Sequence, residues 1–339
     1  MTDTIRLVQL TRIGPPAEAL KLIDAPRPTP GPGEVAIRVQ AFALNRADWL
    51  YAQGWHYTAP VIPSRIGSEC AGLVEAVGPG VAGIRAGDRV CTVPFDTAKY
   101  GVQGEHAIVP VRYLAPWPQG LSAIEAAATW MQYLTAYYAL VDIARLGPGD
   151  HVLVPAASSS AGLGAVQLAS LTGARVIGTT RSQTKIAPIS AAGAAQVVVV
   201  DEQTDLAGAI MQATEGCGVR VVYDPVAGPF MRRYLDALAP HARIFLYGLL
   251  SGAATELDIV PLVRSAAIVH PYSLFNHVRD AAELKRGVDY VLEAVQRRGL
   301  RPVIGRVFPF SQTMEAYREL DRDSHFGKIV IDLQHGCAP

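Results

Sequence analysis

The middle of this chain alternates apolar runs with helical patterns, and this alternation restricts the possible folds more than any other feature. Strand-like runs rich in Val, Ile and Leu follow one another: HVLVPA, RVIGTT, AQVVVVD, VRVVYDPV and ARIFLYGLL. Such near-continuous apolar content is what strands buried on both faces of a parallel sheet require. Because helical segments separate the first strands, the pattern predicts an α/β fold with a doubly wound parallel sheet.

The part of the chain before about residue 122 has a different pattern. Short β-branched runs are punctuated by Gly and Pro, as in EVAIRVQAFAL, AGLVEAVGPGV and GIRAGDRVCTV. This spacing predicts an all-β unit partly closed into a barrel. Ser122 and Glu125 then have capping-box spacing, which predicts a helix that runs on to Gly147 and Pro148. Further on, the chain predicts a long helix, DAAELKRGVDYVLEAVQRRG, and a final strand, GKIVIDL.

Composition excludes several classes of partner. Thirty Lys and Arg balance thirty Asp and Glu, and a chain without a basic excess is not expected to bind nucleic acid or an acidic membrane surface. The four cysteines lie far apart, which favours reduced thiols over a disulfide framework or a zinc lobe. No signal-peptide pattern or membrane-length apolar run occurs. We therefore expect a cytoplasmic protein with a small-molecule substrate.

The segment PAASSSAGLGAVQ follows the first strand of the central region and leads into a helix. In a dinucleotide-binding fold this turn presents backbone N–H groups and a helix N-terminus to the pyrophosphate. Of the positions where such turns carry glycine, Ala157, Ser159 and Ser160 have lost it and Gly162 has kept it. The segment alone is therefore open to two interpretations, a small-residue helix start or a phosphate turn in which serine hydroxyls assist. The residues expected to hold phosphate are Ser158, Ser159, Ser160, Ala161 and Gly162.

The end of the next strand favours the phosphate turn. An NAD-binding protein would place an acidic residue there for the ribose hydroxyls, but this chain has Thr180, followed by Arg181 and Lys185. Threonine does not repel a 2′-phosphate, and nearby cations attract one. The alternative is that Arg181 and Lys185 are solvated surface cations. The missing acid together with the added basic residues predicts NADP(H) as the cofactor.

Taken together, these stretches resemble the medium-chain dehydrogenase/reductase superfamily over essentially the full length of the chain. The resemblance is carried by RIGSECAGLVEAVGPGV, GDRV, EAAATWMQYLTAYYAL, PGDHVLVPAASSSAGLGAVQLA, VVYDPVAG and HFGKIVI. It implies a GroES-like catalytic domain formed by residues 1–125 and 272–339, and a Rossmann dinucleotide-binding domain formed by residues 126–271. It also implies an active site in the cleft between them and a homodimer formed through the edge of the Rossmann sheet.

The positions of the superfamily's catalytic zinc ligands have changed in this chain. The resemblance places them at Asn45, Ser68 and Met131, none of which is a thiolate or an imidazole. Glu69 remains, but one carboxylate does not make a zinc site. The chain is therefore most similar to the zinc-lacking quinone oxidoreductase and enoyl reductase branch. That branch implies hydride transfer from NADPH to a quinone or an α,β-unsaturated carbonyl, without a metal.

The resemblance also suggests catalytic residues. Asn45 is expected near the nicotinamide and substrate. The tyrosine proton donor of enoyl reductases corresponds to His56 here, with Tyr57 next to it. Three interpretations stay open: His56 is the acid, Tyr57 takes the role by a one-residue shift, or both only line the cleft. Other residues expected at the cofactor are Thr135, Tyr223, Tyr247, Gly248, Leu249, Ser273, Leu274 and Lys328, the last of which is alternatively a surface lysine.

Four large aromatic residues are either pocket-lining or core residues: Trp49, Trp55, Trp130 and Tyr133. Two other functions compete with a quinone or enone reductase. One is an enoyl-thioester reductase that acts on a biosynthetic intermediate. The other is a non-catalytic NADPH-binding protein, because the fold alone does not imply catalysis.

Overall fold

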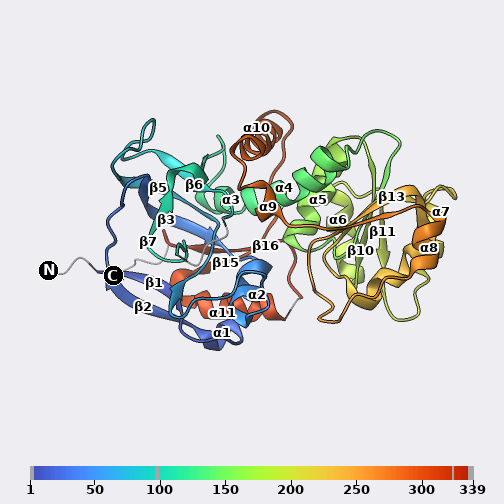
Figure 1. Cartoon of the computed structure of the whole chain (residues 1–339), viewed down its shortest axis with the longest axis horizontal. Coiled ribbons are helices and arrows are strands. Elements are labelled where there is room, and N and C mark those ends of the chain that lie inside the picture. The colour runs from blue at the N-terminus through green and yellow to red at the C-terminus, as the bar shows by residue number, and fades with distance from the viewer. Residues whose placement is uncertain (1–3, 96–98, 323, 335–339) are drawn as a thin grey trace. The chain divides into compact units, whose positions relative to one another are not determined.

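The computed structural model describes residues 4–95, 99–322 and 324–334, and the chain divides into two compact units. Unit 1 comprises the residues up to Met131 and those from Val278 onward, and unit 2 comprises Gln132–His277. The sequence-based boundaries, after residues 125 and 271, fall a few residues earlier at both junctions. Each unit has sheets of its own (Figure 1).

Unit 2 contains the parallel sheet that the apolar runs predicted. Its strand order is β11-β10-β9-β12-β13-β14, and each neighbouring pair is parallel. From β9 the chain first builds one side of the sheet and then the other, so the topological switch of a doubly wound fold lies between β9 and β12. The strands are β9 (His151–Val154), β10 (Arg175–Thr180), β11 (Gln196–Val199), β12 (Val219–Asp224), β13 (Leu238–Leu246) and β14 (Ile268–Pro271).

Helices connect these strands. Longer ones follow the first strands, and short 3-10 turns follow β12, where Gly228–Arg233 and Leu235–Ala237 take that form. The main helices are α5 (Ser160–Leu171), α6 (Ile186–Ala191), α7 (Leu206–Ala213), α8 (Ile259–Arg264) and α9 (Leu274–His277). A 3-10 turn at Gln183–Lys185 precedes α6.

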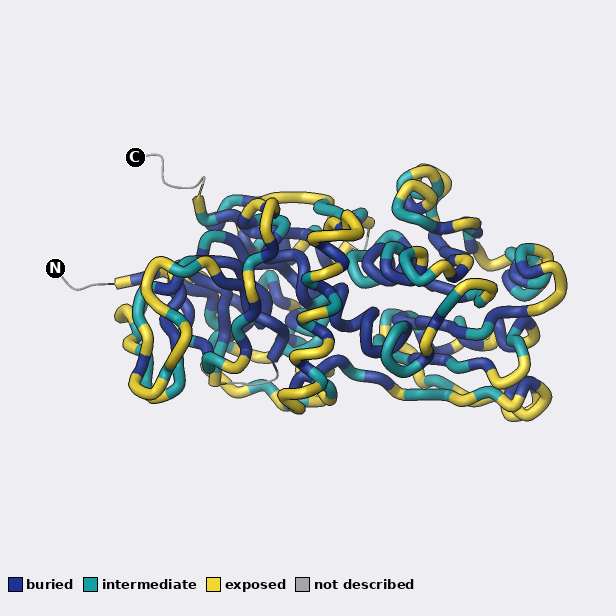
Figure 2. Tube along the Cα trace, turned by 90° about the horizontal axis from the view of Figure 1, so that it is seen from above, coloured by how far each residue is buried: buried dark blue, intermediate teal, exposed yellow. Residues whose placement is uncertain are grey.

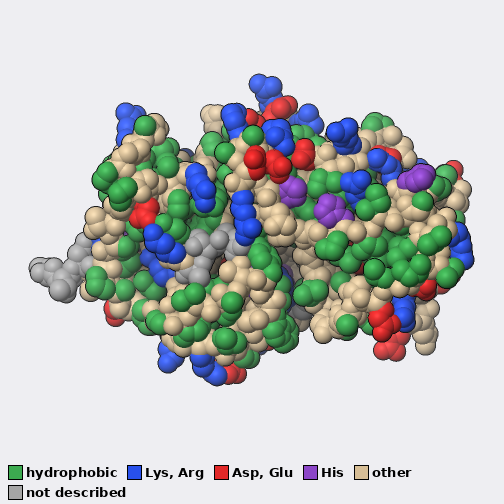
Figure 3. Space-filling view, in the orientation of Figure 1, with side chains coloured by type: hydrophobic (Ala, Val, Ile, Leu, Met, Phe, Trp, Pro, Cys, Tyr) green, Lys and Arg blue, Asp and Glu red, His purple; other side chains and the backbone are tan. Residues whose placement is uncertain are grey.

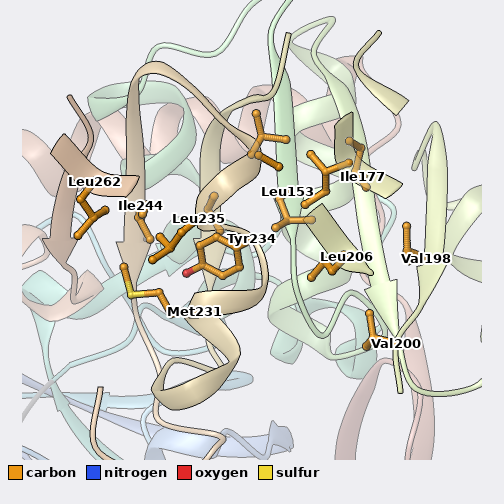
Figure 4. Packing of buried hydrophobic residues seen from close by; sticks show 14 residues of the cluster. Leu153, Ile177, Val198, Val200, Leu206, Met231, Tyr234, Leu235, Ile244 and Leu262 are labelled. Atoms are coloured by element: carbon orange, nitrogen blue, oxygen red, sulfur yellow. The ribbon is translucent and has the colours of Figure 1, made fainter. Parts of the chain in front are cut away.

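A dense apolar core lies between the unit 2 sheet and its covering segments. Leu153, Ile177 and Ile244 of three strands pack in one cluster with Leu206 of α7 and with Tyr234, which lies between the two 3-10 turns (Figure 4). Figure 2 shows buried residues concentrated in the interior of each unit and exposed residues in its outer segments. Burial on both faces explains the high Val, Ile and Leu content of these strands.

Unit 1 combines strands from both ends of the chain. Its larger sheet has the order β15-β16-β3-β5-β6-β8, with β7 paired to β3, and a smaller sheet has the order β2-β1-β4. The C-terminal strand β16 pairs antiparallel with β3. The strands are β1 (Thr4–Leu10), β2 (Leu20–Pro26), β3 (Glu34–Ala43), β4 (Ser64–Arg65), β5 (Cys70–Val77), β6 (Arg89–Thr92), β7 (His106–Pro110), β8 (Leu114–Pro116), β15 (Ile304–Pro309) and β16 (Lys328–Asp332).

The expected all-β character of the N-terminal part is wrong in one respect, because two helices interrupt it. These are α1 (Pro16–Ala19) and α2 (Arg46–Gln53). The second begins after Asn45, with Asp48 as its capping-box partner, and ends at Gly54 in the left-handed conformation. The other helices of unit 1 are α3 (Ala123–Ala127), α10 (Ala281–Arg297) and α11 (Thr313–Asp321), with 3-10 turns at Val111–Tyr113 and Phe310–Gln312.

The single helix predicted from the Ser122 capping box to Gly147 is also wrong in its length. The capping box itself is confirmed, because the Ser122 N–H donates to Glu125 at 2.9 Å and the Glu125 N–H donates back at 3.3 Å. However, α3 ends at Ala127, and the chain continues as α4 (Trp130–Ala136) and a π-helix (Tyr137–Ile143). The Thr129 hydroxyl donates to the Glu125 carbonyl at 2.8 Å, and threonine bonds of this kind bend helices. The break also falls where the chain passes from unit 1 to unit 2.

Candidate active site

The phosphate turn lies at the end of β9, beside the switch point of the unit 2 sheet. The Ser159 hydroxyl accepts a hydrogen bond from the Gly162 N–H at 3.0 Å, which caps the first turn of α5. A Cβ at Gly162 would lie 2.6 Å from the Ala156 carbonyl oxygen, so only glycine fits there. Ala156 itself has a φ of 49°, an uncommon conformation for a residue with a side chain. The segment therefore makes a tight turn into the N-terminus of α5, and its role as a phosphate turn stays a prediction.

The neighbouring strand brings the residues expected to select NADP(H) to the same edge of the sheet. β10 ends at Thr180 beside the turn, and the Ala157 N–H donates to the Thr179 carbonyl at 2.9 Å. Thr180 is buried, and its hydroxyl accepts from the Ser182 N–H at 3.3 Å. Arg181 is exposed and Lys185 is partly exposed. Thus the end of β10 presents a neutral hydroxyl and two cations in place of a carboxylate.

A second turn lies at this edge, after β12, and it was not predicted from the sequence. The Asp224 carboxylate, at the end of β12, accepts from the N–H groups of Val226 and Ala227 at 2.7 and 3.1 Å. The Tyr234 hydroxyl donates to its other oxygen at 2.7 Å. Burial raises the pKa of Asp224, although these hydrogen bonds oppose the rise. The sequence feature that could have indicated this turn is an acidic residue, Asp224, at the end of the apolar run VRVVY.

Several expected cofactor residues lie next to this second turn. The rings of Tyr223 and Tyr247 stack with centroids 4.0 Å apart. A Cβ at Gly248 would lie 2.6 Å from the Pro225 carbonyl oxygen, so this backbone is held tightly against the Asp224 turn. Leu249 follows and is exposed. Burial raises the pKa of Tyr223 well above its ordinary value, so its hydroxyl stays protonated.

The expected residues Thr135, Ser273 and Leu274 also come together. The Tyr272 hydroxyl donates to the Thr135 carbonyl at 2.8 Å, which joins α4 to the segment that holds Ser273 and Leu274. All three residues belong to unit 2. Their contact with the cofactor stays a prediction.

Unit 1 contains a buried polar cluster around Asn45, and it was not foreseen as a cluster. The Lys328 ammonium donates to Asn45 Oδ1 at 2.5 Å and forms an ion pair with Glu69 Oε2 at 2.9 Å. The Asn45 amide donates to Glu69 Oε2 at 3.2 Å, and Glu69 Oε1 accepts from the Met131 N–H at 2.7 Å. The side chains of Lys328 and Glu69 are 1% and 0% exposed. The surface-lysine alternative for Lys328 is therefore wrong.

Strand register explains why these residues meet. β16 runs antiparallel to β3 with Val330 opposite Ala43, and just past β3 the Leu44 N–H donates to the Ile329 carbonyl at 3.0 Å. The same antiparallel course brings Asn45, which follows Leu44, beside Lys328, the first residue of β16. β5 is also antiparallel to β3, and the Ala43 N–H donates to the Glu69 carbonyl at 3.1 Å. In the sequence, Glu69 and Lys328 stand out as charged residues in the apolar stretches GSECAGLV and GKIVIDL. Neither stretch by itself indicates that the two residues pair.

The cluster continues through Asp48. Asp48 Oδ2 accepts from the Asn45 N–H at 3.1 Å and from the Gln103 amide at 3.4 Å, and the Tyr317 hydroxyl donates to Gln103 at 2.9 Å. Burial raises the pKa of Asp48 from 3.8 to about 7, with the Glu69 charge adding to the rise. The hydrogen bond from the Asn45 backbone and the Lys328 charge oppose it. Asp48 therefore changes protonation near neutral pH inside the cluster.

The two candidate proton donors lie in the segment after α2. His56 Nδ1 accepts from the Thr58 N–H at 3.1 Å, so in the neutral ring the proton sits on Nε2. The Tyr57 ring lies against His56 with centroids 4.1 Å apart, and Tyr57 is 58% exposed. His56 is partly exposed, and the choice between the two as proton donor stays open.

The four aromatic residues separate into two pairs. Trp130 and Tyr133 are fully buried, which makes them core residues, and the Tyr133 hydroxyl donates to Gln167 at 2.7 Å. Trp49 and Trp55 pack edge to face at 5.7 Å, and Trp55 is exposed. The pocket interpretation is therefore wrong for the first pair and stays a prediction for the second.

The residues at the zinc-ligand positions do not fit a zinc ion. Asn45 is engaged with Lys328, Ser68 is buried with no thiolate or imidazole beside it in the sequence, and Met131 contributes its backbone N–H to Glu69. Across the described part of the chain, no three His, Cys, Asp or Glu side chains are grouped so that they could hold a metal ion. Among the helices that the structure describes, none has the length and apolar character needed to cross a membrane.

Comparisons with known proteins agree with this architecture. Residues 31–135 match the family described as the alcohol dehydrogenase GroES-like domain, and residues 161–275 match the family described as zinc-binding dehydrogenase. The chain is 30% identical to a quinone oxidoreductase of Pseudomonas aeruginosa, over 96% of this chain and 98% of that protein. A 2-haloacrylate reductase of a Burkholderia species is 29% identical over 89% of this chain and 92% of that protein.

A longer relative and a solved structure complete the comparison. A phenolphthiocerol/phthiocerol polyketide synthase polypeptide of Mycobacterium tuberculosis is 31% identical over 94% of this chain, which spans only 14% of that polypeptide. The crystal structure of Escherichia coli quinone oxidoreductase complexed with NADPH superposes with a TM-score of 0.87 at 27% identity. That match covers 97% of this chain and all of the bacterial chain (100%).

Proposed function

Because this chain belongs to the medium-chain dehydrogenase/reductase superfamily, in its quinone oxidoreductase-like branch, we propose that it is an NADPH-dependent, zinc-independent reductase. Its substrate is a quinone or an α,β-unsaturated carbonyl compound. The observation that carries this proposal is the Asn45–Glu69–Lys328 cluster, which places fixed hydrogen-bonding groups and a cation where zinc-containing members of the superfamily carry metal ligands.

The cofactor is NADP(H). The helix N-terminus at Ser160 and the hydroxyls of Ser158, Ser159 and Ser160 receive the pyrophosphate, together with the backbone at Ala161 and Gly162. Thr180, Arg181 and Lys185 accept the 2′-phosphate, because no carboxylate stands at the end of β10 to repel it. Support comes from the fold shared with the Escherichia coli enzyme, whose structure is an NADPH complex. We assign the nicotinamide side to Thr135, Tyr223, Tyr247, Gly248, Leu249, Ser273 and Leu274, all of which belong to unit 2.

When bound, NADPH would supply a hydride to the carbon conjugated with the carbonyl group, by breaking a C–H bond of its dihydronicotinamide ring, and it would leave as NADP+. A C–H bond forms, the C=C π electrons move onto the carbonyl oxygen, and the resulting enolate takes a proton to complete the reduction. The oxygen needs a hydrogen-bond donor while the charge develops. We assign that task to the site around Asn45, and delivery of the proton to His56 Nε2 or to the Tyr57 hydroxyl.

The first experiment is an activity panel with purified protein. Simple quinones, free enones and acyl thioesters are offered with NADPH or NADH, with and without a chelator. We expect NADPH oxidation with quinones or enones, a clear preference for NADPH, and no loss of activity with the chelator. A preference for NADH would contradict the assignment of Thr180, Arg181 and Lys185, and stoichiometric zinc in the active protein would contradict the metal-free site. NADPH binding without turnover of any substrate would favour a non-catalytic binding protein.

An enoyl-thioester reductase is the second candidate, and one observation favours it. Nearly the whole chain aligns with one part of a much longer protein. That protein is named a polyketide synthase, which is a biosynthetic enzyme. The unsaturated carbonyl of an enoyl thioester needs the same stabilisation of an enolate oxygen. A higher kcat/KM for acyl thioesters than for quinones in the same panel would support this candidate.

We also infer a cytoplasmic homodimer. Ile259, Val260 and Val263 of α8 are exposed, and so is Ile268 of β14, the last strand in the order of the unit 2 sheet. Figure 3 shows hydrophobic side chains gathered over the elements that Figure 1 labels β13 and α8. An apolar surface beside a sheet edge is typical of a subunit interface. The thiols of Cys70, Cys91 and Cys217 are free, as expected in a reducing compartment.

A further inference from the structure

The Lys328–Glu69 ion pair is fully buried, and such a pair is an expensive way to stabilise a fold. Its side chains are 1% and 0% exposed, and its charged atoms are 2.9 Å apart. Two charges lose their hydration on burial, and replacement of a buried pair by neutral side chains of similar volume is often neutral or stabilising. A purely structural role is therefore a weak explanation for retaining these charges in unit 1.

The position of the pair suggests a chemical role. The ammonium lies 2.5 Å from Asn45, the first of the three positions that hold zinc ligands in metal-containing members of the superfamily. Glu69 directly follows the second position, Ser68, and accepts the N–H of the third, Met131, at 2.7 Å. The ammonium is thus tied to all three ligand positions, directly or through one carboxylate. A metal at such a site stabilises negative charge on a substrate oxygen.

The contacts of the ammonium determine how its charge would act. Lysine carries three N–H donors, and two of the resulting hydrogen bonds go to Asn45 Oδ1 and Glu69 Oε2. A cation on the amide oxygen polarises the amide group and strengthens the hydrogen bonds that its N–H groups donate. It also fixes which end of the Asn45 amide is oxygen and which is nitrogen. Lys328 is too deeply buried to be the group that the substrate meets first, whereas Asn45 retains slight exposure.

We propose that Lys328, with Glu69 as its counter-ion, is a built-in cation that takes the place of a catalytic metal and acts through Asn45 on the substrate oxygen. Lys328 and Glu69 are positioning residues, and Asn45 is the group at the substrate. This inference rests on the proposed reductase function. It requires no co-reactant beyond NADPH and the substrate, because the ion pair changes only the stability of the oxygen-centred charge.

The variants are chosen so that charge is removed without leaving a lone buried ion. Lys328→Met alone would leave Glu69 buried and unpaired, which endangers folding. The main variant therefore combines Lys328→Met with Glu69→Gln, two changes that keep side-chain size and remove both charges. Lys328→Arg keeps the charge. Lys99→Met is the matched control, because Lys99 forms an exposed ion pair with Glu34 at 3.1 Å in the same unit.

The readout is the reduction of a series of aryl vinyl ketones whose ring substituents differ in electron withdrawal. For the double variant we expect a kcat about 10–100 times lower than for the wild type, as for other residues that orient a reacting group. The Kd for NADPH, measured by fluorescence titration, stays unchanged. The dependence of log kcat on electron withdrawal becomes steeper, because the substrate must then stabilise its own enolate charge. Lys328→Arg recovers part of the lost rate, and Lys99→Met behaves as the wild type.

Three outcomes would overturn the inference. A double variant that folds with an unchanged substituent dependence would leave the pair with a structural role only. A raised Kd for NADPH with an intact kcat would make Lys328 a cofactor ligand instead. An inactive Lys328→Arg variant with a normal unfolding transition would mean that the shape of lysine matters and its charge does not. If the wild type itself reduces no ketone or quinone, the proposed function fails first.

Discussion

Replacing Asp48 with asparagine should make unit 1 more stable at neutral pH, although Asp48 accepts two hydrogen bonds. Asp48 Oδ2 receives the Asn45 N–H at 3.1 Å and the Gln103 amide at 3.4 Å, and an asparagine oxygen can accept both. What asparagine lacks is the charge. Burial raises the pKa of Asp48 from 3.8 to about 7, so the folded protein holds this proton to a higher pH than the unfolded chain does.

The sign and size of the effect follow from proton linkage. A proton held more tightly by the folded state stabilises it at low pH, and that stabilisation is lost as the pH rises from 3.8 through about 7. Between pH 5 and pH 8 the wild type should lose about 3 kcal/mol of unfolding free energy through Asp48 alone. A loss of this size is large beside a total of about 5–15 kcal/mol. An asparagine side chain cannot titrate, so the Asp48→Asn variant gains by this amount relative to the wild type over the same range.

The assay can be confined to unit 1, because all four tryptophans, Trp49, Trp55, Trp117 and Trp130, belong to it. Urea unfolding followed by tryptophan fluorescence at pH 5, 6, 7 and 8 gives the free-energy difference between variant and wild type at each pH. Asp289→Asn is the control, since Asp289 forms an exposed ion pair with Lys285 in the same unit. A difference for Asp48→Asn that stays constant across these pH values would refute the reasoning.

Two further predictions concern the cofactor turn of unit 2. Gly162→Ala should weaken NADPH binding by about tenfold or more, because the new Cβ would lie 2.6 Å from the Ala156 oxygen and displace the turn. Gly147→Ala is the control, with nothing within 4 Å of its Cβ, and equal affinity of both variants in fluorescence titrations would contradict this account. Thr180→Asp should weaken NADPH by about tenfold through repulsion of the 2′-phosphate while leaving NADH binding unchanged. An equal loss of affinity for NADPH and NADH would show that Thr180 does not discriminate between cofactors with and without the 2′-phosphate.

Local pattern was enough to predict the strands β9 to β13 of unit 2 and one helix start in unit 1. The runs of Val, Ile and Leu became β9 to β13, because burial on both faces leaves little room for polar residues. Ser122 and Glu125 formed their capping box because both partners lie within one turn. Helix α2 carried the same kind of signal at Asn45, Asp48 and Gly54, and was overlooked because its surroundings are rich in strand-forming residues.

The residue types at single positions were also enough to predict which binding functions of the superfamily this chain lacks. Without thiolate or imidazole at Asn45, Ser68 and Met131, no arrangement of these side chains makes a zinc site. Likewise, a neutral residue at the end of β10 cannot bind ribose hydroxyls as a carboxylate does. Such conclusions depend only on the chemical group that a side chain carries, and they do not require knowledge of its neighbours in the fold.

What only the tertiary structure decided is which charged residues meet. Lys328 and Asn45 are 283 residues apart in the sequence, and they face each other because β16 pairs with β3 in one particular register. Glu69 joins them through β5, and the same burial that creates the ion pair raises the pKa of Asp48. Hydrophobic periodicity indicates which face of a strand is buried, but it carries no information about the register or the partner strand. The sequence therefore determined that the zinc ligands are absent, and strand pairing determined that a buried cation lies in their place.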